Sequence, residues 1–144
     1  MARNHKDFTF DYALQLKDAG LVAADAAATV GGSAQVLDLG DSRFEGRIVA
    51  DVTAIEIDNS DEAFLVIAQF SDSATFASGV VNGPVLLFGD ETVVKSTAAT
   101  AVGRYEVGFA NEINGTLYRY MRLYTECQGT VGTGINYAAF VVQP

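Results

Sequence analysis

The sequence contains few of the residues on which most catalytic sites depend. Its 144 residues include no tryptophan, one histidine (His5) and one cysteine (Cys127). A single cysteine excludes an intrachain disulfide, which is typical of a protein made in a reducing cytoplasm. A cysteine nucleophile needs a neighbouring base, and His5 is the only histidine that could serve. We therefore expect Cys127 to be a buried structural thiol, and we expect no enzymatic activity.

Basic residues are also scarce. Nine Lys plus Arg stand against 18 Asp plus Glu, which gives a net charge of −9. An acidic chain repels phosphate backbones, so we expect no nucleic-acid partner. No apolar run approaches the roughly 20 residues that a membrane span needs. The first ten residues, MARNHKDFTF, lack the apolar core of a secretory signal. We therefore expect no membrane partner.

Proline is rare, with 2 residues against 14 glycines, whereas 49% of the chain is hydrophobic. This composition predicts a folded domain with many turns. Short apolar or alternating stretches recur between turn residues, and we expect strands within residues 36–39, 47–57, 64–70, 85–88 and 135–142, and two more within 103–126. The sequence therefore predicts an all-β protein, a single antiparallel β-sandwich of jelly-roll type.

Three of these stretches have informative patterns. Residues 47–57 alternate until the apolar phase slips from Ala54 to Ile55, which predicts a bulge or bend. Residues 64–70 (FLVIAQF) are nearly all apolar, which predicts a central strand. Asn82-Gly83 has the composition of a turn before the strand at 85–88. Residues 92–101 are polar and are expected to form a loop.

The acidic residues offer two further possibilities. The run from Asp58 to Glu62 gathers oxygens of the kind that calcium prefers, but it lacks the alternating ligand pattern of a calcium loop and is interpreted as a solvated turn. Asp51 and Glu56 lie on one predicted strand, but nothing in the sequence sets the carboxylate separation that glycoside cleavage needs. We expect no metal site and no catalytic pair.

The stretch from Gly103 to Glu126 has the composition of a binding surface. Asn114-Gly115 predicts a hairpin turn between two alternating strands. In the second strand Leu117, Met121 and Leu123 share one face, whereas Tyr118, Tyr120, Arg122 and Tyr124 line the other. Tyrosine and arginine are enriched at interface hot spots, so Arg119 and Arg122 are candidate partner contacts. The same pattern also fits tyrosines that cover a core edge with their hydroxyls in water.

The N-terminal segment differs from the rest of the chain. Residues 1–33 are interpreted as an arm and loop ahead of a sandwich at 34–144, within one domain overall. Phe8, Phe10 and Tyr12 alternate with polar residues, which predicts an extended aromatic edge that pairs with another chain. These three residues are the other candidate contacts. A short helix over residues 23–28 is the alternative for part of this segment, since alanine is the best helix former.

Segments spread over most of the chain carry a family resemblance. They are residues 10–40 (FDYALQLKDAGLVAADAAATVGGSAQVLDLG), 69–76 (QFSDSATF), 102–106 (VGRYE), 118–123 (YRYMRL) and 134–140 (GINYAAF). In this order and spacing they resemble the small capsid cement, or decoration, proteins of tailed phages related to the Bordetella phage cement protein.

The resemblance implies a jelly-roll sandwich that assembles as a homo-oligomer, a dimer or a trimer, on a shell of HK97-like major capsid protein. It implies no enzymatic activity and no cofactor. The implied location is the outer capsid surface of the virion, after synthesis in the cytoplasm of a host bacterium. A carbohydrate-binding β-sandwich is the alternative, with the tyrosine-lined face as a sugar platform, although the lack of tryptophan weighs against it.

Overall fold

The computed structural model describes residues 14–95 and 98–143. Sheet A contains β1 (Gln15–Lys17), β2 (Leu21–Val22), β7 (Glu45–Ile55), β10 (Gly103–Ala110) and β14 (Ile135–Val142). Sheet B contains β3 (Ala26–Ala27), β6 (Leu37–Asp38), β8 (Ala63–Ser71), β9 (Val81–Gly89) and β13 (Tyr120–Gln128). Two short hairpins, β4 (Thr29–Val30) with β5 (Ser33–Ala34) and β11 (Glu112–Ile113) with β12 (Thr116–Leu117), and the helix α1 (Glu91–Val94) complete the described elements.

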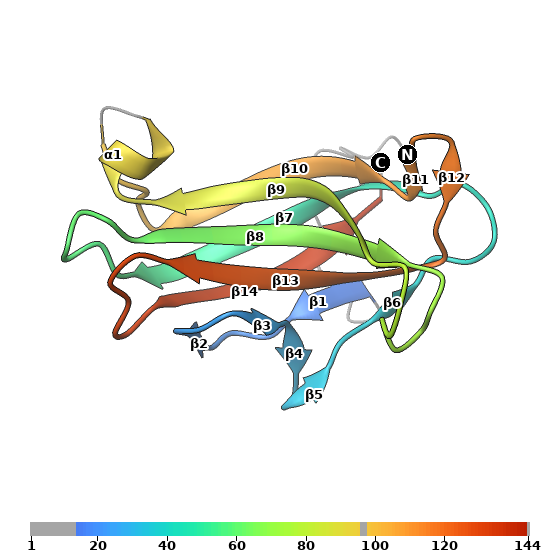
Figure 1. Ribbon diagram of the computed structural model, residues 1–144, viewed down its shortest axis with the longest axis horizontal. Helices are drawn as coiled ribbons and strands as arrows, with labels where there is room; N and C mark the ends of the chain where they lie inside the picture. Colours follow the sequence, from blue (N-terminus) through green and yellow to red (C-terminus); the bar gives the residue numbers. More distant parts are fainter. Residues whose placement is uncertain (1–13, 96–97, 144) are drawn as a thin grey trace, which may run out of the picture.

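The two sheets face each other as the layers of a sandwich (Figure 1). Sheet A has the strand order β1-β14-β7-β10, and sheet B has the order β3-β13-β8-β9. The first and last strands of the described residues, β1 and β14, therefore lie side by side. The chain passes repeatedly from one sheet to the other. This is the strand order of a jelly roll, and the predicted all-β sandwich is confirmed. In the described ranges, no helix has the length and apolarity of a membrane span.

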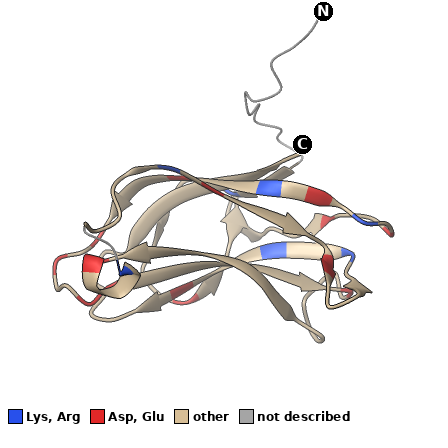
Figure 2. Cartoon of the chain, turned by 90° about the horizontal axis from the view of Figure 1, so that it is seen from above, with Lys and Arg blue, Asp and Glu red and all other residues tan. Residues whose placement is uncertain are grey.

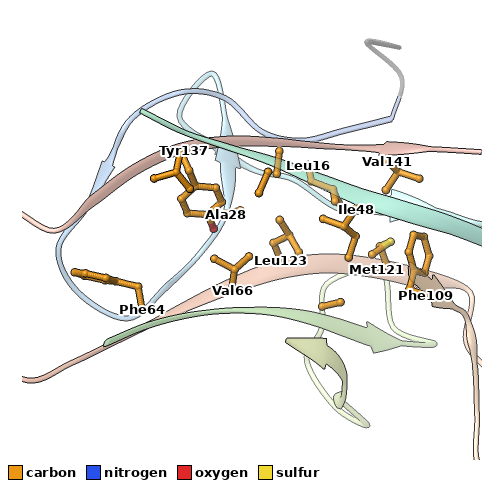
Figure 3. Close-up of a cluster of buried hydrophobic side chains, with 14 of the residues drawn as sticks. Leu16, Ala28, Ile48, Phe64, Val66, Phe109, Met121, Leu123, Tyr137 and Val141 are labelled. Carbon is orange, nitrogen blue, oxygen red and sulfur yellow. The ribbon is translucent and has the colours of Figure 1, made fainter. Parts of the chain in front are cut away.

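The core lies between the sheets and follows the alternation of the strands. Side chains from both sheets point toward one another there (Figure 3). The largest fully buried side chains include Phe64 and Phe70 of β8, Met121 and Leu123 of β13, and Tyr137 of β14. Burying each large apolar side chain stabilises the fold by roughly 1.5–3 kcal/mol. The run at 64–70 is central as predicted, because β8 lies between β13 and β9.

The phase slip in the long strand corresponds to a bulge. In the pairing of β7 with β14, Ala54 lies opposite Asn136 and Val52 lies opposite Tyr137. Thr53 is therefore the extra residue, and it reverses which side chains of β7 face the core. The bulge predicted from the sequence is confirmed.

The long hairpin predicted within residues 103–126 is wrong. β10 pairs with β7 in sheet A, whereas β13 pairs with β8 in sheet B, so the two strands lie in different layers. Asn114-Gly115 does form a turn, with positive φ values of 53° and 81°, but it joins only the two-residue strands β11 and β12. Alternation indicates which face of a strand is apolar, but it does not identify the partner strand.

The turn expected at Asn82-Gly83 is also wrong, because both residues lie inside β9. A glycine is required there, since a Cβ at Gly83 would lie 2.6 Å from Cε2 of Phe70. Pro84 is tolerated in this strand because β9 forms an edge of its sheet. In the polar stretch 92–101, α1 occupies the beginning, with Asp90 as its N-cap.

The described part of the predicted N-terminal arm, residues 14–33, is built into the sandwich. β1 and β2 pair with β14, and β3 pairs with β13, so this segment contributes to both sheets. Leu16 is fully buried in the core. No helix forms over residues 23–28, because Ala26 and Ala27 pair with β13 instead. Phe8, Phe10 and Tyr12 lie outside the described residues.

Candidate functional site

The tyrosine and arginine residues of β13 lie on the outer face of sheet B. Met121, Leu123 and Thr125 are buried, so alternation turns the residues between them outward. The pairing of β13 with β8 and of β8 with β9 places further residues on the same face. We call the following set the outer face of sheet B: Leu65, Ile67, Gln69, Asn82, Val85, Leu87, Tyr120, Arg122, Tyr124 and Glu126.

Arg122 is held in one orientation on this face. Its Nε donates a hydrogen bond to Oε1 of Gln69 at 2.9 Å, directly across the strand pair. Its guanidinium carbon lies 4.5 Å from the ring centroid of Phe76 and 5.7 Å from that of Tyr124. Guanidinium groups stack favourably on aromatic rings, so both rings limit the motion of the side chain.

Phe76 reaches Arg122 from the loop that connects β8 to β9. Its backbone has φ of 56°, a left-handed conformation that costs a bulky residue about 1–2 kcal/mol. The loop compensates with its own hydrogen bonds: the amide of Phe76 donates to the carbonyl of Ser73 at 3.0 Å, and Oγ of Ser71 donates to the carbonyl of Ser78 at 2.9 Å. The strained conformation places the ring against Arg122 with only 7% of the residue exposed.

The other arginines of the described residues have carboxylate partners. Arg43 pairs with Glu45 and Glu112, Arg47 with Glu106, Arg104 with Asp51, and Arg119 with Asp38 and Asp41. Figure 2 shows basic segments beside acidic ones toward one end of the sandwich. Within residues 14–95 and 98–143, Arg122 alone among the arginines has no ion pair. The structure thus distinguishes it from the rest.

Arg119 and Arg122, the two arginines predicted as partner contacts, therefore differ in whether their guanidinium is free to bind a partner. Nε and Nη2 of Arg119 each donate to an oxygen of Asp38 at 2.9 Å, and Nη1 lies 3.4 Å from Asp41. The hydrogen bonds from Arg119 are the main cause that lowers the pKa of Asp38. Arg119 also lies over the ring of Tyr120 at 5.4 Å. It braces the β6–β13 pair, whereas Arg122 is not engaged with a carboxylate.

The outer face of sheet B also carries exposed apolar side chains on β9, which β8 separates from the strand of Arg122. Val85 is 42% exposed and Leu87 is 44% exposed, both on the edge strand β9. The chain has no charged residue from Ser73 to Gly89. Edge strands usually carry charges that prevent contact with other chains, so an uncharged edge next to an apolar face is typical of an interaction surface.

The remaining candidates from the sequence have structural roles. The carboxylate of Glu56 accepts hydrogen bonds from the amides of Gly132, Thr133 and Gly134, and these bonds lower its pKa. Asp51 is paired with Arg104.

Glu62 is buried and accepts from the amides of Asn59 and Asp61, which shapes the predicted acidic turn. Among the residues that the structure describes, no group of three or more potential ligands is placed to hold a metal ion.

Cys127 is half-buried and packs against the core. Burial, and then the charge of Asp25, raise the pKa of its thiol to about 11. The thiol is therefore less buried than the sequence predicted, although its environment still disfavours the thiolate.

An open depression of about 420 Å³ lies along the N-terminal strands, and five of its twelve lining residues are alanines. Lys17 borders it, but its Nζ already donates to the carbonyls of Asp18, Gly20 and Tyr137, at 3.0, 3.0 and 2.7 Å. The depression therefore offers no free polar group from Lys17 to orient a ligand.

The sequence predicted Arg122 as a candidate contact but gave no such role to Phe76 and Gln69, which hold it in the structure. A single aromatic residue in the polar run 71–79 was the available signal for Phe76. In comparisons with known proteins, no protein-family model and no curated protein matches the chain.

Proposed function

We propose that this chain is a structural virion protein, a cement or decoration protein that binds the outer surface of an HK97-like phage capsid and stabilises it. The observation that carries the proposal is the outer face of sheet B, where an oriented arginine shares one sheet face with the exposed apolar residues of an uncharged edge strand. The family resemblance supports the same role.

The fold is suited to a passive binding role. Two sheets with a continuous core form a stiff body, and a stiff body resists the separation of the subunits that it bridges. In a dimer or trimer, several individually weak contacts to the major capsid protein act together through effective concentration. The net charge of −9 disfavours contact with packaged DNA, which fits a location on the outside of the shell.

Cosedimentation with expanded heads that lack decoration protein tests this proposal. The heads come from the phage that encodes the chain, and bound protein is quantified against free protein. We expect saturable binding at a fixed ratio to the capsid subunits. A folded protein that stays in the supernatant at all concentrations would contradict the proposal.

A carbohydrate-binding module is the second candidate, because Tyr120, Tyr124 and Gln69 share one sheet face. Each tyrosine ring already has a guanidinium over it, from Arg119 and Arg122, which leaves less free ring surface for a sugar. A glycan array with purified protein tests it directly. Saturable binding to one class of glycan, together with no binding to heads, would favour this second candidate.

A further inference from the structure

We propose that Arg122 is a receptor for a carboxylate of the docking partner, an aspartate or glutamate side chain set among apolar residues. The inference rests on the proposed function only for the identity of the protein that carries the carboxylate. The site itself consists of Arg122, Gln69, Phe76 and Tyr124.

The first argument is the free donor capacity of Arg122. A guanidinium has five N–H donors, and the one on Nε is used by Gln69. Nη1 and Nη2 of Arg122 make no hydrogen bond with a described residue. Among the described residues, every fully buried side-chain nitrogen or oxygen does have a hydrogen-bond partner, so these two nitrogens are not among the fully buried atoms. They therefore keep contact with solvent. Their parallel N–H groups match the two oxygens of a carboxylate.

The second argument comes from the cross-strand position. Arg104 lies opposite Asp51 in the β10–β7 pair, and the two residues form an ion pair at 2.7 Å. Arg122 lies opposite Gln69 in the β13–β8 pair. An amide at this position orients the guanidinium without neutralising it. In a chain with twice as many acidic as basic residues, an arginine left unneutralised on the outer face of a sheet is available for an external anion.

The third argument is preorganisation. Phe76 and Tyr124 hold the guanidinium, and Phe76 does so from a strained backbone conformation. Backbone strain persists where the surrounding structure enforces it, and it clusters at ligand-binding sites. A side chain that is already ordered loses less conformational entropy when it binds.

The surroundings select the kind of anion. One guanidinium flanked by the rings of Phe76 and Tyr124 suits a single carboxylate whose neighbours are apolar, since apolar neighbours exclude water from the charged contact. A polyphosphate or nucleic acid needs several cations, and a chain with a net charge of −9 repels it.

The experiment uses two arms on the full chain. In the first arm, NMR follows the Nε–Hε resonance of Arg122 while an acetylated Leu-Asp-Leu peptide amide is added, with Leu-Asn-Leu as the control peptide. We expect a saturable shift with the aspartate peptide alone. Gln69→Glu supplies an internal carboxylate to Arg122 and is expected to abolish this shift while leaving the fold intact. The Arg104 resonance serves as the internal control.

In the second arm, Gln69→Glu and Arg122→Lys are tested for binding to expanded heads. We expect each variant to weaken binding to the heads by about tenfold or more. Glutamate at position 69 neutralises Arg122, and lysine at position 122 keeps the positive charge but lacks the paired N–H groups of a guanidinium. Arg104→Gln, on the other sheet, is the matched control and is expected to bind as the original chain does.

The outcomes separate the two proposals. A peptide shift without head binding would leave the carboxylate site standing and remove the cement function. Head binding that is unchanged in both variants, with no peptide shift, would overturn the carboxylate site alone. A shift with glucuronate but not with the aspartate peptide would also overturn it, since the ligand would then be an acidic sugar.

Discussion

The hydroxyl group of Tyr137 lies 2.6 Å from Oγ1 of Thr125, and both residues are buried. Tyr137 belongs to β14 in sheet A, and Thr125 belongs to β13 in sheet B. The Tyr137 ring points into the core between the sheets (Figure 3). This hydrogen bond therefore joins the two layers inside the core, where the ammonium group of the buried Lys17 lies 4.5 Å from the ring centroid of Tyr137. It fixes how the sheets are positioned relative to each other.

Replacement of Tyr137 by phenylalanine tests this link. Tyr137→Phe leaves the buried hydroxyl of Thr125 without its partner, so we expect the free energy of unfolding to fall by about 1–3 kcal/mol in urea denaturation. Tyr105→Phe is the control, because that hydroxyl donates to the carbonyl of Ala101 at an exposed position. We expect the double variant Tyr137→Phe/Thr125→Val to regain part of the loss, and no regain would contradict the account.

Tyr137 also predicts how stability depends on alkaline pH. Burial, its largest cause, raises the pKa of Tyr137 to about 12 from an ordinary value of 10.0. Between these values the unfolded chain has lost the proton and the folded chain has kept it, so the free energy of unfolding falls as the pH rises. We expect denaturation curves from pH 9 to 12 to show this fall, and Tyr137→Phe to show a shallower one. Equal slopes would be inconsistent with a buried, protonated Tyr137.

The thiol of Cys127 is expected to react slowly. Its pKa of about 11 leaves on the order of 10²-fold less thiolate at pH 8 than a free cysteine has. Iodoacetamide labelling followed by mass spectrometry should show a correspondingly low rate that increases with pH up to about 11. Asp25→Asn keeps an acceptor for the Cys127 amide but removes the charge, so labelling should become faster. Labelling at the rate of a free cysteine would contradict the structure.

Gly83 is expected to tolerate no side chain. A Cβ at this position would lie 2.6 Å from Cε2 of Phe70, a core residue of β8. Gly83→Ala should lower the free energy of unfolding by about 1–3 kcal/mol in urea, because the ring must move within a packed core. Gly20→Ala is the matched control, since a Cβ at Gly20 meets no atom within 4 Å. Equal effects of the two substitutions would argue against this packing.

The carboxylate of Glu56 is expected to matter at neutral pH and not in acid. The amides of the loop from Gly132 to Gly134 lower its pKa, so its contribution to stability is present above the ordinary value of 4.5 and is lost as the pH falls through the folded value. Glu56→Gln should lower the melting temperature at pH 7, and the difference should shrink toward pH 3. Amide exchange in this loop should become faster. Glu126→Gln, whose carboxylate has no hydrogen bond or ion pair with a described residue, is the control.

Local sequence patterns predicted the strands well but not their partners. The strand at 135–142, the central position of 64–70 and the bulge in β7 follow from side-chain alternation, which depends on neighbouring residues. The placement of β10 and β13 in different sheets depends on pairings with strands far along the chain. No local pattern encodes those pairings, and the Asn-Gly turn between the two strands suggested a hairpin.

The candidate site shows the same division. Alternation placed Arg122 on an outward face, and the structure agrees. The features that distinguish Arg122 from Arg119 are contacts with Phe76, Gln69 and Asp38, which lie between 46 and 81 positions away. Such contacts require the three-dimensional fold. The predicted contacts Phe8, Phe10 and Tyr12 remain predictions.

The disruption temperature of phage heads tests the central claim most directly. Expanded heads without decoration protein are mixed with a saturating amount of the purified chain, and light scattering follows their disruption on heating. Heads with the folded protein added but washed away before heating serve as the control. The account predicts a higher disruption temperature for the decorated heads, with an increase that saturates at the binding ratio. Heads that bind the protein but break at the same temperature as bare heads would contradict it.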